Sequence, residues 1–303
     1  PWVQAHLTNR ARRLRQDADE TGGTSEAAYC LFVWHHHQGF IRKHFPDFRP
    51  SHVLEFGPGD TVGVGLSALM SGAQTYTGVD AHRYLNLDLT RQHADEIHDL
   101  LLAHQAQGKT PSLAGTTVSR LPQDVLDAFC QRQTNIRDSG ASYDANQRMN
   151  YLSPLSPSGI SAALPEAKFD LCMSQAVQEH VDTPDVAYRA MFKALKPGGV
   201  FSHEVDFRSH QTSYDWNGHW VYSERQWDIA QNNMTFTYIN RLPLSGHLAL
   251  IEAAGFRVLR VSPAKQVSDI DRAHLAPRWK DLTQEDLETA GAHILAEKPL
   301  TAG

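Results

Sequence analysis

One short stretch decides the fold, and it reads His52-Val-Leu-Glu-Phe-Gly-Pro-Gly-Asp-Thr61. The apolar residues at its start predict a short strand, and Gly57 and Gly59 predict a sharp turn directly after that strand. Residues 62–71 then carry a helical pattern. Glycines in such a turn let a ligand approach the main chain, and the start of the next helix offers free N–H groups. We therefore expect a ligand-binding loop here.

An acidic residue follows at the spacing that a nucleoside ligand requires. Residues 74–80 predict a second strand that ends on Asp80, 21 residues after Gly59. A carboxylate at this point can accept hydrogen bonds from both hydroxyls of a ribose. The sequence thus predicts a doubly wound α/β fold of the Rossmann-like type. A nicotinamide-dependent oxidoreductase is a disfavoured alternative, since Gly57-Pro58-Gly59-Asp-Thr-Val62 lacks the last glycine of the dinucleotide fingerprint.

The rest of the chain supplies the other units of such a fold. Further strands are predicted at 149–152, 169–174, 200–207, 256–261 and 292–297, and helices at 92–105, 123–133, 185–195 and 244–254. The long interval between the second and third strands suggests a helical insertion at about 90–148. We expect an N-terminal helical cap over 1–50 and a core domain over 51–300.

Four motifs, in the right order, resemble the class I S-adenosylmethionine-dependent methyltransferases. They are the glycine loop with its strand, Asp80, Phe169-Asp-Leu-Cys-Met-Ser-Gln-Ala-Val-Gln-Glu-His-Val181, and Leu195-Lys-Pro-Gly-Gly-Val200. The resemblance implies a seven-stranded sheet of order 3-2-1-4-5-7-6 with an antiparallel last strand, and S-adenosylmethionine as cofactor.

The same resemblance implies roles for individual residues. Those expected to bind the cofactor are Glu55, Gly57, Pro58 and Gly59 at its methionine end, Asp80 at its ribose, and Ser174 and Gln175 at the methyl group. Residues 153–156 would lie near the adenine. Two departures are Thr61, where the family often has a third glycine, and the lack of the usual acid after the third strand.

Histidines and carboxylates follow the fourth and fifth strands, whose carboxyl ends face the ligand crevice in such sheets. An imidazole suits the removal of a proton from a hydroxyl acceptor, and a carboxylate can orient it. The predicted catalytic residues are His180, His203, Asp206, His210 and His219. The alternative for each histidine is a structural hydrogen-bonding role.

A divalent metal is a second way to use these side chains. Small-RNA 2′-O-methyltransferases carry a similar Glu-His after the fourth strand, which binds an ion together with an earlier Glu and a distant His. This chain has Ala176 at the earlier position, so we do not expect a metal. If one binds, the predicted ligands are His180, Asp206 and His210.

The amino-acid composition disfavours a nucleic-acid-binding protein and a membrane protein. The 303 residues hold 28 Lys and Arg against 34 Asp and Glu, a net charge of −6, which disfavours a nucleic-acid partner. Three dispersed cysteines and the lack of a visible signal peptide or apolar span predict a cytoplasmic protein that spans no membrane. Among the 17 histidines, His35-His-His37 is expected to have a surface or helix-capping role.

The acceptor is the least determined feature. An aromatic segment, Trp216, Trp220, Tyr222, Trp227 and Phe236 with Arg241, could stack on a sugar or could simply pack a core. Residues 202–241 also look like bacterial methyltransferase-like proteins of surface-polysaccharide pathways. We therefore predict O-methylation of a small-molecule or carbohydrate acceptor. A non-catalytic scaffold that keeps the cofactor fold is the alternative, and the oligomeric state stays open.

Overall fold

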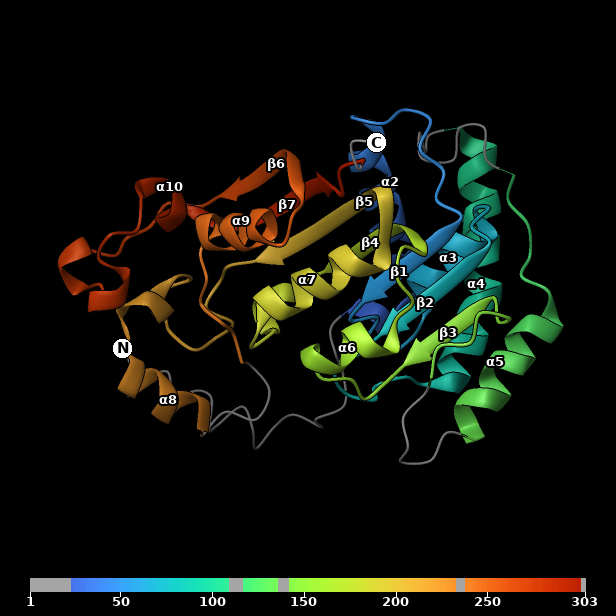
Figure 1. Ribbon diagram of the computed structural model, residues 1–303, viewed down its shortest axis with the longest axis horizontal. Coiled ribbons are helices and arrows are strands. Elements are labelled where there is room, and N and C mark those ends of the chain that lie inside the picture. Colours follow the sequence, from blue (N-terminus) through green and yellow to red (C-terminus); the bar gives the residue numbers. More distant parts are fainter. Residues whose placement is uncertain (1–22, 109–116, 136–141, 233–237, 301–303) are drawn as a thin grey trace.

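A seven-stranded sheet forms the centre of the computed structural model, which describes residues 23–108, 117–135, 142–232 and 238–300 (Figure 1). The strand order is β3-β2-β1-β4-β5-β7-β6, as predicted. The first five strands in this order are parallel, and β7 runs antiparallel to both β5 and β6. The strands are β1 (His52–Phe56), β2 (Thr75–Val79), β3 (Met149–Leu152), β4 (Phe169–Gln175), β5 (Leu195–Asp206), β6 (Arg257–Lys265) and β7 (Thr289–Glu297).

The central strands are apolar on both faces because helices cover both faces of a parallel sheet. In β1, Val53 and Leu54 point to opposite sides and both are fully buried. The fifth strand begins earlier than its sequence predicts. The expected turn at 196–199 lies within β5, where Leu195 still pairs with Phe169.

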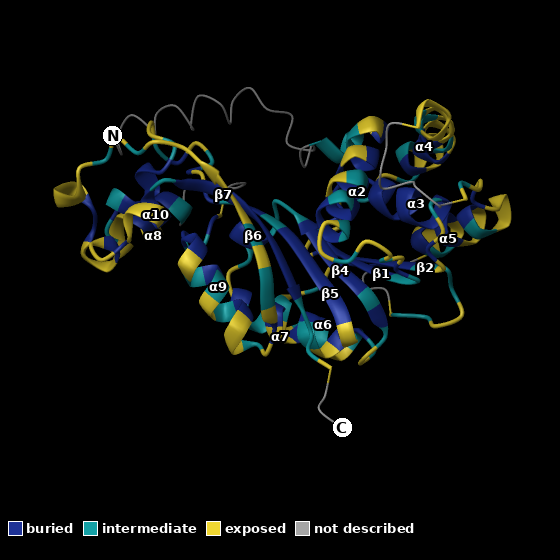
Figure 2. Cartoon of the chain, turned by 90° about the horizontal axis from the view of Figure 1, so that it is seen from above, coloured by how far each residue is buried: buried dark blue, intermediate teal, exposed yellow. Residues whose placement is uncertain are grey.

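Two helical layers enclose the sheet (Figure 2). One layer holds α2 (Ala27–Arg42), α3 (Gly63–Met70), α4 (Leu87–Gln107) and α5 (Gln123–Asn135); the other holds α6 (Pro157–Ala163), α7 (Pro184–Ala194) and α9 (Leu244–Ala253). Each layer packs its own hydrophobic core against the sheet. Two short helices, α8 (Glu224–Asn232) and α10 (Gln284–Leu287), lie beyond the end of β5 in Figure 1.

The interval between β2 and β3 is helical, as predicted, but it forms part of a layer. Helix α4 packs on α2 and α3, and α5 packs on β3. This interval contains the crossover that joins the neighbouring parallel strands β2 and β3, and such a connection usually includes a helix. Residues 109–116 and 136–141 of this interval lie outside the described residues.

The N-terminal segment packs on the sheet domain. Residues 1–22 lie outside the described part; then η1 (Gly23–Ser25) leads into α2, which contacts α3, α4 and β5. The predicted surface position of the histidine triplet is wrong for His37, which is fully buried, whereas His36 is partly exposed. Three consecutive residues on a helix point in three directions, so one of them faces the core.

Gly57 occupies a position that only glycine fits. Its φ is +70°, and a Cβ atom placed there would lie 2.4 Å from Val177 Cγ2. We expect Gly57→Ala to lower the free energy of unfolding by about 2–4 kcal/mol, from left-handed backbone strain and overpacking together. Chemical denaturation measures this loss.

Gly108 provides the matched control for that substitution. It has a φ of +62°, and among the described residues no atom outside its own helix backbone and chain neighbours lies within 4 Å of its Cβ position. Gly108→Ala should therefore cost only the backbone strain, about 1 kcal/mol. Equal losses in the two variants would contradict the tight contact between Gly57 and Val177.

Candidate functional site

The crevice predicted for the cofactor lies at the carboxyl ends of β1, β2 and β4. Strands β1 and β4 are neighbours from which the chain crosses to opposite sides, and ligands bind at such a switch point in open α/β sheets. Gly57 and Gly59 both have positive φ and form the loop after β1. The Gly57 amide donates to the carbonyl oxygen of Val79, which ties this loop to the end of β2.

Asp80 lies directly beside the glycine loop. One of its carboxylate oxygens accepts a hydrogen bond from the Gly59 amide at 3.2 Å. Burial raises the pKa of this carboxyl to about 7, against hydrogen bonds from backbone amides that lower it. The structure thus brings Gly57, Gly59 and Asp80 together, as the sequence predicted.

Glu55 is buried beneath the glycine loop, whereas Asp80 lies beside it. Its side chain is buried on the α3 side of β1, where the Tyr76 hydroxyl donates a hydrogen bond of 2.6 Å to Oε2. Burial raises its pKa to about 8. Glu55 therefore lies beneath the loop and supports it through the β1–β2 pair, and its predicted contact with the methionine end stays a prediction.

The third position of the glycine motif has a structural explanation. Thr61 stands there, and its hydroxyl donates to the Thr24 carbonyl at 2.8 Å. The Asp60 amide donates in turn to the Thr24 hydroxyl at 3.0 Å. The loop is thus closed from outside by η1. This contact was not predictable from the sequence, because 36 residues separate Thr24 from Asp60.

Ser174 and Gln175, the residues predicted at the methyl group, have partners on different sides of the sheet. The Ser174 hydroxyl lies 2.5 Å from His203 Nδ1, and His203 is fully buried against Phe201. Gln175 Oε1 lies 3.2 Å from His37 Nε2. Burial lowers the pKa of His203 well below its ordinary value, so this imidazole is neutral in the core.

Four of the polar side chains form a group that we term the Glu179 cluster: Glu179, His180, Asp206 and His210. His210 Nε2 lies 3.8 Å from Asp206 Oδ2 and 4.0 Å from Glu179 Oε1. The rings of His180 and His210 meet edge to face, with centroids 4.8 Å apart. The 3₁₀ turn η3 (Gln178–His180) and the end of β5 bring these residues together.

Glu179 belongs to the motif after the fourth strand, but the sequence did not predict it as a site residue. It is 3% exposed, and neither carboxylate oxygen has a partner in good hydrogen-bond geometry among the described residues. Burial raises its pKa well above the ordinary range, although the backbone amides of Glu179 and Asp206 act to lower it. A buried carboxyl with such weak partners costs free energy, which makes Glu179 a candidate functional residue. Its inward direction is set by the 3₁₀ turn, which the sequence does not reveal.

The charge states of the cluster differ from residue to residue. Burial raises the pKa of Asp206, but hydrogen bonds from Arg208 outweigh that effect, and the pKa is lowered. For His210, burial lowers the pKa of the imidazole, and the nearby His180 lowers it further. A neutral imidazole therefore lies beside an ionised carboxylate. His210 has a positive φ of 45°, a strained conformation that is frequent at functional sites.

The remaining catalytic candidates take different positions. His180 Nδ1 lies 2.7 Å from the Tyr238 carbonyl oxygen, so Nδ1 donates and Nε2 keeps its lone pair. His219 is buried, and burial lowers its pKa well below the ordinary value. Metal ligands are available in the cluster too: one atom each of Glu179, His180 and His210 lie within 4.8 Å of one another. Glu179 replaces the predicted Asp206 in this set.

The aromatic segment packs small cores beyond the sheet. Trp220, Tyr222 and Trp227 are buried, and Arg241 lies over the Trp227 ring at 4.5 Å. These rings therefore do not form an open platform for a sugar. Phe236 lies outside the described residues.

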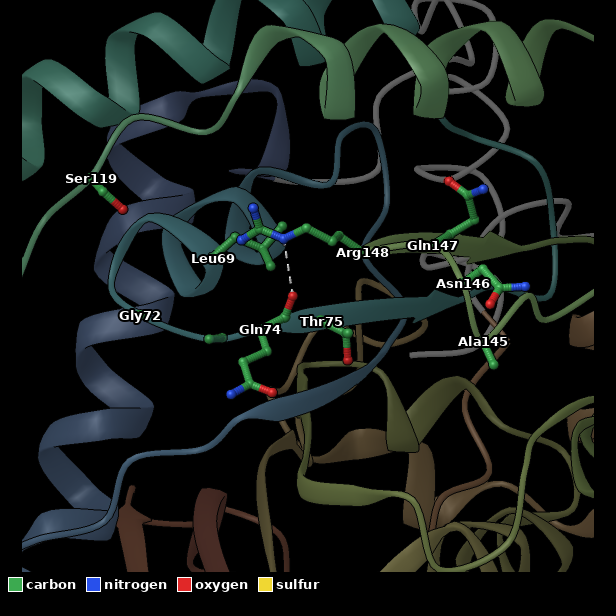
Figure 3. A pocket seen from close by; sticks show the side chains of 10 residues that line it. Leu69, Gly72, Gln74, Thr75, Ser119, Ala145, Asn146, Gln147 and Arg148 are labelled. Atoms are coloured by element: carbon green, nitrogen blue, oxygen red, sulfur yellow. Dashed lines mark hydrogen bonds between the residues drawn. The ribbon is translucent and has the colours of Figure 1, made fainter.

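A polar hollow at the other edge of the sheet is not part of this site (Figure 3). It lies where β2 and β3 begin, and Arg148 crosses it to donate a hydrogen bond to the Gln74 carbonyl. The amino ends of the strands are remote from the glycine loop and from Asp80.

A family model described as a methyltransferase domain matches residues 33–261. The chain belongs to this methyltransferase family. It is an S-adenosylmethionine-dependent methyltransferase, as its motifs predicted, and the glycine loop and Asp80 lie at the carboxyl edge where the fold binds its cofactor.

Solved methyltransferases show a distant similarity. An S-adenosylmethionine-dependent methyltransferase from Mesorhizobium loti is 12% identical with a TM-score of 0.40, over 81% of this chain and 90% of the other. Phosphoethanolamine N-methyltransferase 2 from Haemonchus contortus is 14% identical with a TM-score of 0.46, over 88% of this chain and 53% of the other. A search of curated proteins gave no match.

The methyltransferase has no helix that could cross a membrane in the part of the chain that the structure describes. Its longest helix there, α4, is polar over most of its surface, and no described helix combines the length and apolar character that a membrane span requires.

Proposed function

We propose that this methyltransferase transfers a methyl group to an oxygen atom of a small molecule or glycan, with His210 as the general base. One observation carries the proposal: a neutral imidazole lies 3.8 Å from an ionised carboxylate, at the edge where the cofactor's methyl group is expected. S-adenosylmethionine supplies an activated methyl group, so the protein has to align the acceptor and remove its proton.

Different residues of the site bind the cofactor and remove the proton. Gly57, Gly59 and Asp80 hold the cofactor, and His210 takes the proton from the acceptor hydroxyl. Asp206 stabilises the imidazolium that forms, since a carboxylate at this distance favours the charged ring. Glu179 adds a second acidic group at 4.0 Å from the same nitrogen.

His203 is less suited to this role. It is fully buried, its Nδ1 lies against Ser174, and its ring packs on Phe201. His219 is equally enclosed. The His210 side chain is 19% exposed, and its Nε2 atom is buried without a hydrogen-bond partner among the described residues, so this nitrogen is left for the hydroxyl of an acceptor that enters the cluster.

Location and organisation are part of the proposal. Three free, buried cysteines, Cys30, Cys130 and Cys172, suit a reducing compartment, so we place the protein in the cytoplasm. We also keep the division into an N-terminal cap over 1–50 and a methyltransferase domain over 51–300.

Transfer from radiolabelled S-adenosylmethionine tests the acceptor class. Hydroxylated acceptors, such as sugars and phenols, would be compared with matched amines at several pH values. We expect label on oxygen and a rate that rises with pH and levels off once the base is neutral. Transfer to nitrogen acceptors alone, or a rate independent of pH, would contradict the proposal.

A further inference from the structure

A second group of polar side chains lies where α2 meets β5 and β7, and we term it the His36 triad. It consists of His36 from α2, Glu204 from β5 and His293 from β7. His36 Nε2 and His293 Nδ1 each lie 3.4 Å from Glu204 Oε2, and the two nitrogens are 3.1 Å apart. Three ligand-type atoms thus form a nearly equilateral triangle.

The size of this triangle matches one metal geometry. In a tetrahedral zinc site with bonds of about 2.1 Å, neighbouring ligand atoms are about 3.4 Å apart. The separations of the three atoms, 3.1 to 3.4 Å, are therefore close to those that an ion about 2 Å from each of them requires. Nitrogen ligands with one carboxylate oxygen suit zinc and similar divalent transition metals.

The neighbours of the triad fix its orientation. The Ser202 hydroxyl lies 2.8 Å from His293 Nε2, so the ring presents Nδ1 to the triangle. The ring also stacks on Phe40, with centroids 3.8 Å apart. Metal-binding imidazoles commonly have such a hydrogen bond on the second nitrogen, because it holds the ring in one direction.

We propose that His36, Glu204 and His293 bind a zinc ion whose fourth ligand is water. The side chains of His36 and Glu204 are 39% and 26% exposed, so solvent reaches the remaining position. The site is separate from the Glu179 cluster and does not depend on the proposed methyl acceptor.

The ion would join three elements that are distant in sequence. His36 is 168 residues from Glu204 and 257 residues from His293. Ser202 also lies 2.8 Å from His37 Nδ1, and His37 lies 3.2 Å from Gln175, so the triad connects to the predicted methyl-transfer pocket. A bound ion would hold α2 on the sheet beside that pocket.

Titration of the metal-free, full-length protein with Co²⁺ tests the site directly. Tetrahedral Co²⁺ absorbs intensely in the visible range, and Zn²⁺ should displace it. We expect one ion per chain with the tetrahedral spectrum in the wild type. His36→Ala and Glu204→Gln remove one ligand each and should weaken binding at least ~100-fold, since even loss of a hydrogen bond to a ligand costs about 10–100-fold.

Two further variants separate the sites. His44→Ala removes an exposed histidine just after α2 and should leave Co²⁺ binding unchanged, as should His210→Asn in the Glu179 cluster. The proposal is overturned by any of three results: no Co²⁺ binding to the wild type, an octahedral spectrum, or loss of binding in His210→Asn with retention in His36→Ala. None of these readouts depends on methyl transfer.

Discussion

Asp80→Ala should weaken the binding of S-adenosylmethionine about 100-fold. The carboxylate is expected to accept two hydrogen bonds from the ribose, and loss of such charge-assisted bonds costs about 3 kcal/mol in total. The Gly59 amide would also lose its 3.2 Å acceptor, which loosens the loop that holds the methionine end. Isothermal titration calorimetry with the cofactor and its demethylated product measures the effect.

The same carboxyl predicts a pH dependence of cofactor binding. Its pKa is raised to about 7 by burial, and the ionised form is the better acceptor for the ribose hydroxyls. Affinity should therefore fall as the pH decreases through 7, by up to about tenfold per pH unit below the pKa. In Asp80→Ala this dependence should disappear.

Asp88→Ala is the control for both measurements. Asp88 lies in the first turn of α4, eight positions after Asp80, and is exposed. Its removal should leave cofactor affinity unchanged. If Asp80→Ala binds as tightly as the wild type, the assignment of Asp80 to the ribose is wrong.

His210→Asn should lower kcat about 100- to 10,000-fold while cofactor affinity stays near that of the wild type, because the variant lacks a general base. Asparagine is preferred to alanine here since it tolerates the positive φ of this position. Turnover with saturating cofactor, compared with calorimetric affinity, separates the loss of chemistry from a loss of binding.

Two other variants sharpen this second prediction. Asp206→Asn leaves the imidazole but removes the ionised partner 3.8 Å away, so kcat should fall less, and its rise with pH should shift to lower pH. His274→Ala removes an exposed histidine, with a side chain 77% exposed, and should have no effect. A kcat unchanged in His210→Asn would exclude His210 as the base.

Much of the fold was predictable because its signals are local. The apolar run of β1 and the spacing to Asp80 predicted the first unit correctly, and the bounds of β1 and β3 agree with the expected residues. The packing of residues 90–148 was not predictable in the same way. Helical periodicity shows that a segment is a helix, whereas its place in a layer depends on contacts with α2, α3 and β3.

The environments of the histidines could not be predicted from the sequence either. Sequence reasoning placed His180 and His210 at one edge of the sheet, because each follows a neighbouring strand. It could not tell that His203 is enclosed by Ser174 and Phe201. It also could not reveal the partners of His36, since Glu204 and His293 lie far away in the sequence.

By itself, the sequence determined the strand–turn–helix unit with its glycine loop and Asp80, because those features depend on backbone conformation and on short spacings. The strand order and the cofactor followed from the resemblance of its motifs to a known family. Only the tertiary structure decided which polar side chains lie together, as in the Glu179 cluster and the His36 triad. Burial and proximity arise when distant segments pack, and they set both the pKa of an imidazole and the neighbours that it can serve.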